Sequence, residues 1–343
     1  EDGIRDHCVT GVQTCALPIS LTLQAVDTST VNAEVDAIAA SMSFADKSAS
    51  LSAAIGVALS RNFIGETQGD SGNSGGDPQP YDNPSKAQDG SHVKGNLLQA
   101  GILGSTVLLT GDLSIKATQA SQIDAYVDSF SAALGLANQQ GFALAGSGAE
   151  ASNRTLETIL ATFEQATGRA TPDQLQARDV TLQASDASRI HTTAWGAALG
   201  ASFGGSLSGN AAIGVALARN TLNNTVQSRL KGLAGGSQAL RSLSVAASKQ
   251  RTGAEPSIQA TSAAVSLALG FSGGTGVSLS GGGSDALNTL LGDVLTRLDA
   301  VTLQTTGAIA IASTSDQRLK AGVGAGVGSG SFSPSGEIGR AHV

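Results

Sequence analysis

A short alternating segment recurs along the chain and limits what this sequence can fold into. It reads LTLQA at 21–25, and its counterparts are LSIKA at 113–117, VTLQA at 180–184, LSVAA at 243–247 and IAIAS at 309–313. The last four begin about 65 residues apart, and self-similarity at such a period is typical of repeat architectures. In these, each unit buries its apolar face only against its neighbours. We therefore expect a stack of similar units.

A second marker follows most of these segments. AAIGVALSRN at 53–62 and AAIGVALARN at 211–220 are identical at nine of ten positions, and 141–153 and 276–288 are their counterparts. The shared last position gives an equivalent series: Asn62, Asn153, Asn220 and Asn288. Units one and three resemble each other most, as do units two and four, so the period is either one unit or a pair. We expect the asparagines to adopt left-handed turns and cap backbone groups where strands change direction, rather than to form a ligand ladder.

The local period of two, with β-branched residues, predicts strands within each unit. Residues 196–220 fit two strands around a Gly/Ser turn at 204–209. After the asparagine, Leu222, Val226 and Leu230 fit a strand in the third unit. The leucines of 284–300 fit a helical stripe better, and 154–165 is equally ambiguous. The post-asparagine segments of units two and four are therefore left open between strand and helix.

The predicted fold class is all-β. A unit of this length divides into roughly three coils of about 21 residues, a size typical of a β-solenoid, in which rungs stack at the strand spacing of about 4.8 Å into a β-helix-like rod. The alternative is an antiparallel β-roll of stacked hairpins, which the turn at 204–209 leaves open.

The two ends of the chain differ from the rest in composition. Residues 1–19 and 337–343 can both be encoded by one common sequencing adapter, read in opposite directions, and the first contains Cys8 and Cys15. We exclude both segments from the fold, as one would a fusion scar, and expect the native chain to continue past them. The expected organisation of the remainder is unit one at 20–112 with a loop insert at about 63–93, then units at 113–179, 180–242 and 243–308, and the start of a fifth at 309–336.

Composition excludes several classes of function. The formal net charge is −7, whereas a nucleic-acid-binding chain needs a basic face. No apolar run reaches the length of about 18 residues that a transmembrane helix needs, so no transmembrane segment is expected. Aromatic residues make up only 3% of the chain and glycine is abundant, which favours thin cores over the bulky core of a compact enzyme.

The insert at 65–90 is where catalytic chemistry would first be suspected. GDSG at 69–72 and GNSGG at 72–76 look like serine-hydrolase motifs, but these need a strained strand-to-helix turn and an oriented histidine, and outside the adapter segments only His92 and His191 occur. The acids of the insert do not match a calcium-loop spacing: Asp70, Asp77, Asp82 and Asp89. We expect a solvated loop that contacts partners.

The remaining candidates have structural interpretations. We expect Trp195 to fill a locally wide coil rather than to form an exposed platform for stacking carbohydrate, and His191 to face solvent. GVGAGVGSGS at 322–331 lacks the full dinucleotide fingerprint. The sequence therefore predicts no catalytic, cofactor-binding or metal-ligating residue, and no cofactor.

Three runs resemble the β-strand repeats of very large bacterial surface proteins. They are VTLQASDASRI at 180–190, GAALGASFGG at 196–205 and AAIGVALARNTLNNTV at 211–226. These surface proteins are the filamentous haemagglutinin-like and leukotoxin-type adhesins, and the resemblance covers nearly all of 20–333. It implies a non-catalytic secreted or surface-exposed rod, acting as an adhesin or a stalk, whose loops contact a host-surface or matrix glycan or protein. The alternative is a β-helical polysaccharide lyase or hydrolase, which needs acids or bases converging on one face. We also expect edge-to-edge self-association through open strand edges.

Overall fold

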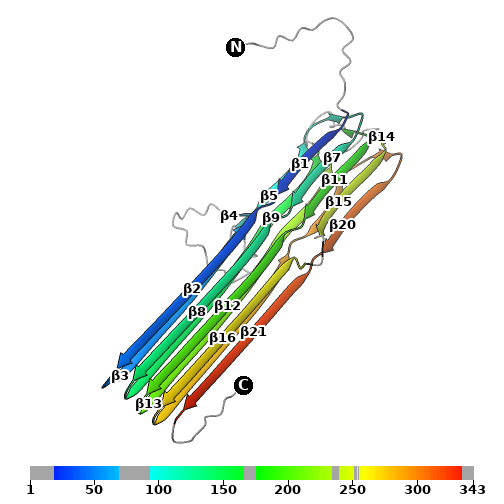
Figure 1. Ribbon diagram of the computed structural model, residues 1–343. Coiled ribbons are helices and arrows are strands. Elements are labelled where there is room, and N and C mark those ends of the chain that lie inside the picture. Colours follow the sequence, from blue (N-terminus) through cyan, green and yellow to red (C-terminus); the bar gives the residue numbers. More distant parts are fainter. Residues whose placement is uncertain are drawn as a thin grey trace, which may run out of the picture.

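The computed structural model describes residues 19–68, 93–165, 175–233, 239–250, 253 and 255–333. Within these ranges every regular element is a strand and no helix occurs, which confirms the all-β prediction. Most of the insert, including its four candidate acids and His92, lies outside the described residues. Figure 1 shows the strands aligned along one elongated slab.

One repeat unit carries the chain along one layer of the slab and back along the other. In the third unit, β11 (Asp179–Asp186) and β12 (Arg189–Gly204) follow each other in one layer. After a short turn, β13 (Leu207–Lys231) returns in the second layer, and β14 (Ala239–Leu240) follows it. Consecutive long strands therefore face each other across the slab.

The other units repeat this path, with the return strand divided in units one and four. Unit one comprises β1 (Leu21–Asp27), β2 (Thr30–Ala45), β3 (Ala49–Ile64), β4 (Glu66–Gln68), β5 (Val93–Leu103) and β6 (Val107–Leu108). Unit two comprises β7 (Leu113–Gln119), β8 (Gln122–Ala137), β9 (Gln140–Glu164) and β10 (Leu175–Gln176). Unit four comprises β15 (Ser242–Gln250), β16 (Ile258–Ser272), β17 (Thr275–Leu291), β18 (Val294–Asp299) and β19 (Gln304–Thr305), and unit five comprises β20 (Ile309–Asp316) and β21 (Leu319–Phe332).

Equivalent strands of successive units form three large sheets. Sheet A has the order β1-β7-β11-β15-β20, and sheet B has the order β2-β8-β12-β16-β21. Sheet C contains β3, β9, β13 and β17, with β5 paired to β9 beyond β3, and β18 paired to β13 beyond β17. Two small sheets pair β6 with β10 and β14 with β19.

The strand pairs of these sheets are parallel, and only the short pair of β4 with β5 is antiparallel among the described strands. The antiparallel roll of hairpins was therefore wrong, because each turn sends the chain into the facing layer rather than into the neighbouring place in one sheet. The division into three coils of about 21 residues was also wrong. Leu113 pairs with Leu21 and Val180, so the strands pair at the spacing of the whole unit.

The post-asparagine segments of units two and four are strands, within β9 and across β17 and β18. The leucines of unit four that suggested a helix divide between the two faces of sheet C, on β17 and β18. Leu290 and Leu298 pack against buried clusters, whereas Leu287 points outward. The strand prediction for unit three is confirmed by β13.

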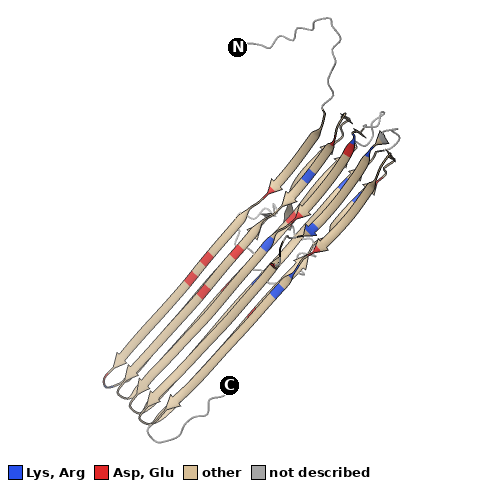
Figure 2. Cartoon of the chain, turned by 45° about the vertical axis from the view of Figure 1, so that its right-hand side comes forward, with Lys and Arg blue, Asp and Glu red and all other residues tan. Residues whose placement is uncertain are grey.

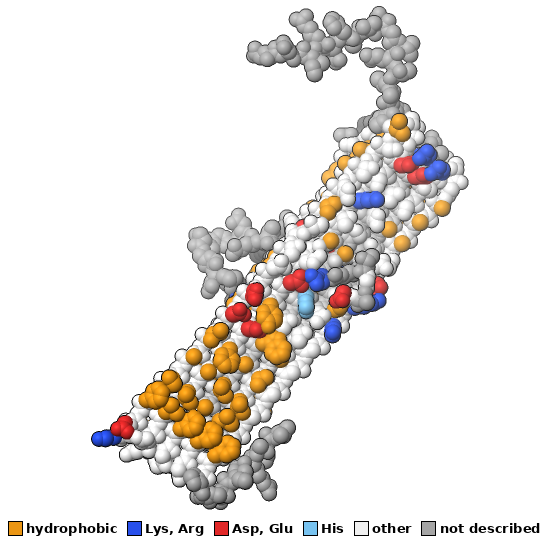
Figure 3. All heavy atoms as spheres, in the orientation of Figure 1, with side chains coloured by type: hydrophobic (Ala, Val, Ile, Leu, Met, Phe, Trp, Pro, Cys, Tyr) orange, Lys and Arg blue, Asp and Glu red, His pale blue; other side chains and the backbone are white. Residues whose placement is uncertain are grey.

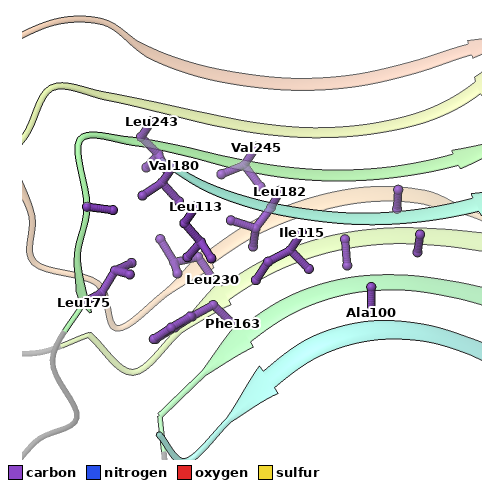
Figure 4. Close-up of a cluster of buried hydrophobic side chains, with 14 of the residues drawn as sticks. Ala100, Leu113, Ile115, Phe163, Leu175, Val180, Leu182, Leu230, Leu243 and Val245 are labelled. Atoms are coloured by element: carbon purple, nitrogen blue, oxygen red, sulfur yellow. The ribbon is translucent and has the colours of Figure 1, made fainter. Parts of the chain in front are cut away.

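The space between the layers is wide at one end and thin at the other. Under sheet A it holds the largest buried cluster, with Leu113, Ile115, Phe163, Leu182 and Leu230 directed into it (Figure 4). Under sheet B the buried hydrophobic residues are mostly alanine. A row of larger side chains separates these two parts: Ile64, Ile123, Ile190, Leu222 and Ile258.

Candidate interaction surface

The two layers approach so closely under sheet B that bulky side chains cannot point inward. A Cβ atom added to Gly214 would lie 2.7 Å from the carbonyl oxygen of Val265, and one on Gly56 would lie 2.9 Å from that of Phe130. The inward positions of β12 beyond Ile190 accordingly hold only threonine, alanine, glycine and serine. Because side chains alternate between faces in a strand, the large ones point outward.

The outer face of sheet B consequently has a broad apolar patch, which we call the sheet B patch. Figure 3 shows it in orange on the half of the slab farthest from sheet A. Its exposed large side chains are Ile38, Met42, Phe44, Tyr126, Phe130, Trp195, Phe203, Val265, Leu267 and Phe332. Exposed apolar areas of this kind mark interaction sites in soluble proteins.

Aromatic side chains give the sheet B patch its shape. Phe203 and Phe271 stack with ring centroids 4.6 Å apart, and Phe332 stacks on Phe271 at 5.1 Å. Trp195 lies on the outer face of β12 with 47% of its surface exposed. The prediction that Trp195 fills a wide coil was wrong, because a glycine- and alanine-lined interior has no room for an indole.

Carboxylates border the patch on the side toward sheet A (Figures 2 and 3). Glu34 and Asp36 point outward from β2, and Asp124 and Asp128 occupy outward positions of β8. A side-chain hydrogen bond with Asp128, together with burial and the neighbouring acids, raises the pKa of Tyr126. The border can accept hydrogen bonds from a ligand that lies across the aromatic rings.

One basic contact crosses this acidic border. Arg189 donates from Nη2 to Oδ2 of Asp124 at 2.6 Å, which joins units two and three on the surface. The half-exposed side chain of His191 places Nδ1 3.8 Å from Oδ1 of the same carboxylate. The predicted solvent-facing position of His191 therefore holds, with Asp124 as its neighbour.

The asparagine series lies between the layers and not at turns. Asn62 donates from Nδ2 to Oδ1 of Asn153 at 2.7 Å, Asn153 to Asn220 at 3.1 Å, and Asn220 to Asn288 at 3.0 Å. These residues lie within β3, β9, β13 and β17. The turn-capping prediction was wrong, because the amides hydrogen-bond along the stack of units.

A second polar network, which the sequence analysis missed, lies where the chain passes from sheet A to sheet B. Gln119 donates from Nε2 to Oδ2 of Asp27 at 3.2 Å and also to Oε2 of Glu157. In the next unit Asn224 donates to Oδ2 of Asp186 at 3.0 Å. Burial, followed by repulsion from Asp27 and hydrogen bonding with it, raises the pKa of Glu157 to about 8.

No group of three or more His, Cys, Asp or Glu side chains among the described residues is arranged to hold a metal ion.

A signal for this network was present in the alternation. The inward positions of the first strands are apolar until the last, where Asp27, Gln119, Asp186 and Lys249 are register partners. Lys249 donates to the backbone oxygens of Leu291 and Gly292, at 3.2 and 2.8 Å. A polar residue repeated at one inward position predicts a polar row inside the stack.

No protein-family model matches the chain, and no curated protein or solved structure shows significant similarity to it. The described part of the chain contains no helix that could span a membrane.

Proposed function

We propose that this chain is part of a secreted or surface-exposed bacterial repeat protein that acts, without catalysis, as an adhesin on a structural stalk. Its stacked units would form a β-solenoid rod, and the outer face of the rod would bind the partner. The sheet B patch is the observation that carries this proposal, because a chain that buries alanine and exposes tryptophan and phenylalanine presents a surface suited to binding.

The contacts between units support the role as a stalk. Arg178 binds Asp112 through two hydrogen bonds of 3.0 Å, from Nε and Nη2, and Arg241 binds Asp179 in the same way one unit further along. Each such exposed pair stabilises little, because water and salt screen the charges. They do favour the register in which each unit lies directly on its neighbour, as a rod requires.

The chemistry of the patch favours a glycan as the partner. Trp195 and Tyr126 present aromatic surface to the apolar face of a sugar ring, while the exposed carboxylates of Glu34 and Asp36 on the neighbouring strand can accept hydrogen bonds from hydroxyl groups. A mainly apolar surface with a few fixed polar groups is the usual composition of a specific binding site. The sheet face thereby supplements the loop contacts expected from the sequence.

The test is binding of the full chain to immobilised glycans and matrix proteins, compared with Trp195→Ala and the control Leu199→Ala on the same face of β12. We expect Trp195→Ala to weaken glycan binding at least ten-fold and Leu199→Ala to change it little.

A folded chain that binds no glycan or matrix protein would remove the adhesin part of the proposal. Release of new reducing ends from a bound polysaccharide would overturn the non-catalytic part. An export signal or surface anchor in the complete reading frame would support the proposed location, and a cytoplasmic enzyme around these units would contradict it.

A further inference from the structure

The outer face of sheet C is corrugated, because bulky and glycine positions alternate from one unit to the next. One row of register partners across four strands consists of Ile55, Gly146, Ile213 and Gly281. The same order of bulky residue and glycine recurs two residues further along, at Val57, Gly148, Val215 and Gly283. In these two rows, units one and three therefore form apolar ridges, and units two and four form furrows. One outward position earlier the order reverses, because the register partners there are Ala53, Leu144, Ala211 and Leu279.

The furrows are open and the ridges are exposed. A Cβ atom added to Gly148, Gly281 or Gly283 would meet no atom within 4 Å. On the ridges, Ile55 is 75% exposed and Ile213 is 55% exposed. The furrow floors thus have room for side chains that this chain does not itself supply.

Charged residues lie at the same end of the ridges and the furrows. The ridges end in Arg61 and Arg219, which share one row of the sheet. The furrows end in Glu150 and Asp285, one outward position earlier. Within the chain, Arg219 lies 3.8 Å from Asp285, with both side chains more than one-third exposed. Ridges are therefore basic at this end and furrows acidic.

We propose that this face docks on the same face of a second copy of the chain, with ridges in furrows. A two-fold axis parallel to the strands places unit one over unit four of the second copy, and unit three over unit two. Each ridge then faces a furrow, and the two copies use identical surfaces, as a two-fold dimer requires. Arg61 then lies one outward position further along the strands than Asp285 of the second copy, and Arg219 one further than Glu150 of the second copy. Each long arginine side chain can extend back to the facing carboxylate.

The corrugation selects this occupant over a general apolar partner. The ridges are two strands apart, about 9.6 Å, and a second sheet of the same period fills both furrows at once. A lipid surface would use neither the furrows nor the alternating charges. The reverse docking, with antiparallel strands, would place Arg61 and Arg219 against aliphatic side chains and leave both furrow acids without a partner.

The area is adequate for a stable dimer. Four strands at about 4.8 Å and eleven residues at about 3.3 Å give a face of about 700 Å² per copy. This is close to the roughly 800 Å² per partner of a standard interface. The contact is face to face, and so it differs from pairing through open sheet edges.

The test is sedimentation velocity of the full chain over a range of concentrations, with the double variant Gly148→Val, Gly283→Val. A Cβ atom at either position meets nothing within 4 Å, so the variant should fold, and the valines should fill the furrows and make the dimer at least ten-fold weaker. The control Ala40→Val, Ala132→Val adds similar apolar surface to outward positions of sheet B and should leave the dimer unchanged. Added apolar surface ordinarily strengthens association. A variant that adds such surface in the furrows and yet weakens the dimer therefore indicates that ridges of the second copy occupy them.

Charge reversal tests the direction of docking. Glu150→Arg and Arg219→Glu should each weaken the dimer, and their combination in one chain should restore most of it. The proposal is overturned if the chain stays monomeric, or if furrow filling leaves association unchanged or strengthens it. It is also overturned by an open-ended series of sizes that the variants do not alter, which would indicate edge pairing. Binding to phosphatidylcholine vesicles in place of self-association would assign the face to lipid instead.

Discussion

Asn153 donates a hydrogen bond of 3.1 Å from Nδ2 to Oδ1 of Asn220, its register partner in the next unit. Thr192, from the facing sheet, donates to the same oxygen and accepts a second hydrogen bond from Asn153. The two amides thus join neighbouring units and also join the two layers. In an interior with few large side chains, such ladders supply contacts that are specific for register.

Replacement of Asn220 by alanine should be strongly destabilising. The change removes the donor to Oδ1 of Asn288 and to the backbone oxygen of Gln259, and it removes the acceptor for Asn153. Buried polar groups that lose their partners cost about 1–3 kcal/mol each, so we expect a loss of about 2–4 kcal/mol in the free energy of unfolding. Urea unfolding measures it. The control Asn223→Ala, at an outward position of the same strand, should cost less than about 1 kcal/mol. Equal losses for the two variants would show that the ladder does not stabilise the stack.

The thin half of the slab predicts opposite signs for two glycine substitutions. A methyl group on Gly196 would clash with the carbonyl oxygen of Val215 in the facing layer, whereas one on Gly148 meets nothing within 4 Å. We expect Gly196→Ala to destabilise by about 1–3 kcal/mol or more, because two backbones must separate. Gly148→Ala should stabilise by about 0.5 kcal/mol, because alanine loses less conformational entropy on folding. Thermal unfolding of the two variants decides the point. Two losses of similar size would contradict the close approach of the layers.

The same arrangement separates two leucines with the same sequence pattern. Leu182 is fully buried beneath sheet A, and Leu267 is 38% exposed on the outer face of sheet B. Leu182→Ala should cost about 2–5 kcal/mol, as for other core leucines. Leu267→Ala should cost less than about 1 kcal/mol, although it too occupies an alternating strand. Chemical denaturation of both variants tests which face is the interior, and a larger loss at Leu267 would reverse the assignment.

The register of the stack could be predicted from the sequence because repetition marks equivalent positions directly. Aligning LSIKA with VTLQA pairs Leu113 with Val180, and the structure has this pair. The asparagine series was likewise predicted to be equivalent. The position of these asparagines within strands was not predicted, because equivalence in sequence does not say whether a residue lies in a turn or in the middle of a strand.

Two other features could not be derived from local patterns. A Gly/Ser turn such as 204–209 reverses the chain whether the next strand joins the same sheet or the facing one, so the turn alone does not distinguish a hairpin from a passage between layers. Alternation also assigns Trp195 and Ala194 to opposite faces without saying which face is buried. The usual preference for large apolar residues inside favours the wrong face here, because close contact between layers requires the small ones.

The buried carboxyl of Glu157 should make the stability of the stack depend on pH. Its pKa in the folded chain is about 8, above the ordinary value of 4.5, and its side chain is only 2% exposed. Below pH 4.5 the group is protonated in both states, so its contribution is fully present. As the pH rises from 4.5 to 8, the unfolded chain loses the proton while the folded chain keeps it, and stability is lost. At about 1.4 kcal/mol per pH unit the total loss is at most about 5 kcal/mol.

Glu157→Gln imitates the protonated carboxyl, since its amide oxygen can accept from Gln119 and its amide nitrogen can donate to Asp27. We expect this variant to match the parent chain near pH 4.5 and to exceed its melting temperature progressively up to pH 8. The control Glu34→Gln removes an exposed carboxyl from the outer face of sheet B, and so the difference between the two pH profiles isolates the buried position. Parallel profiles for Glu157→Gln and the parent chain would mean that Glu157 is ionised inside the stack. The network of Asp27, Gln119 and Glu157 would then need a compensating positive charge that the described residues do not place there.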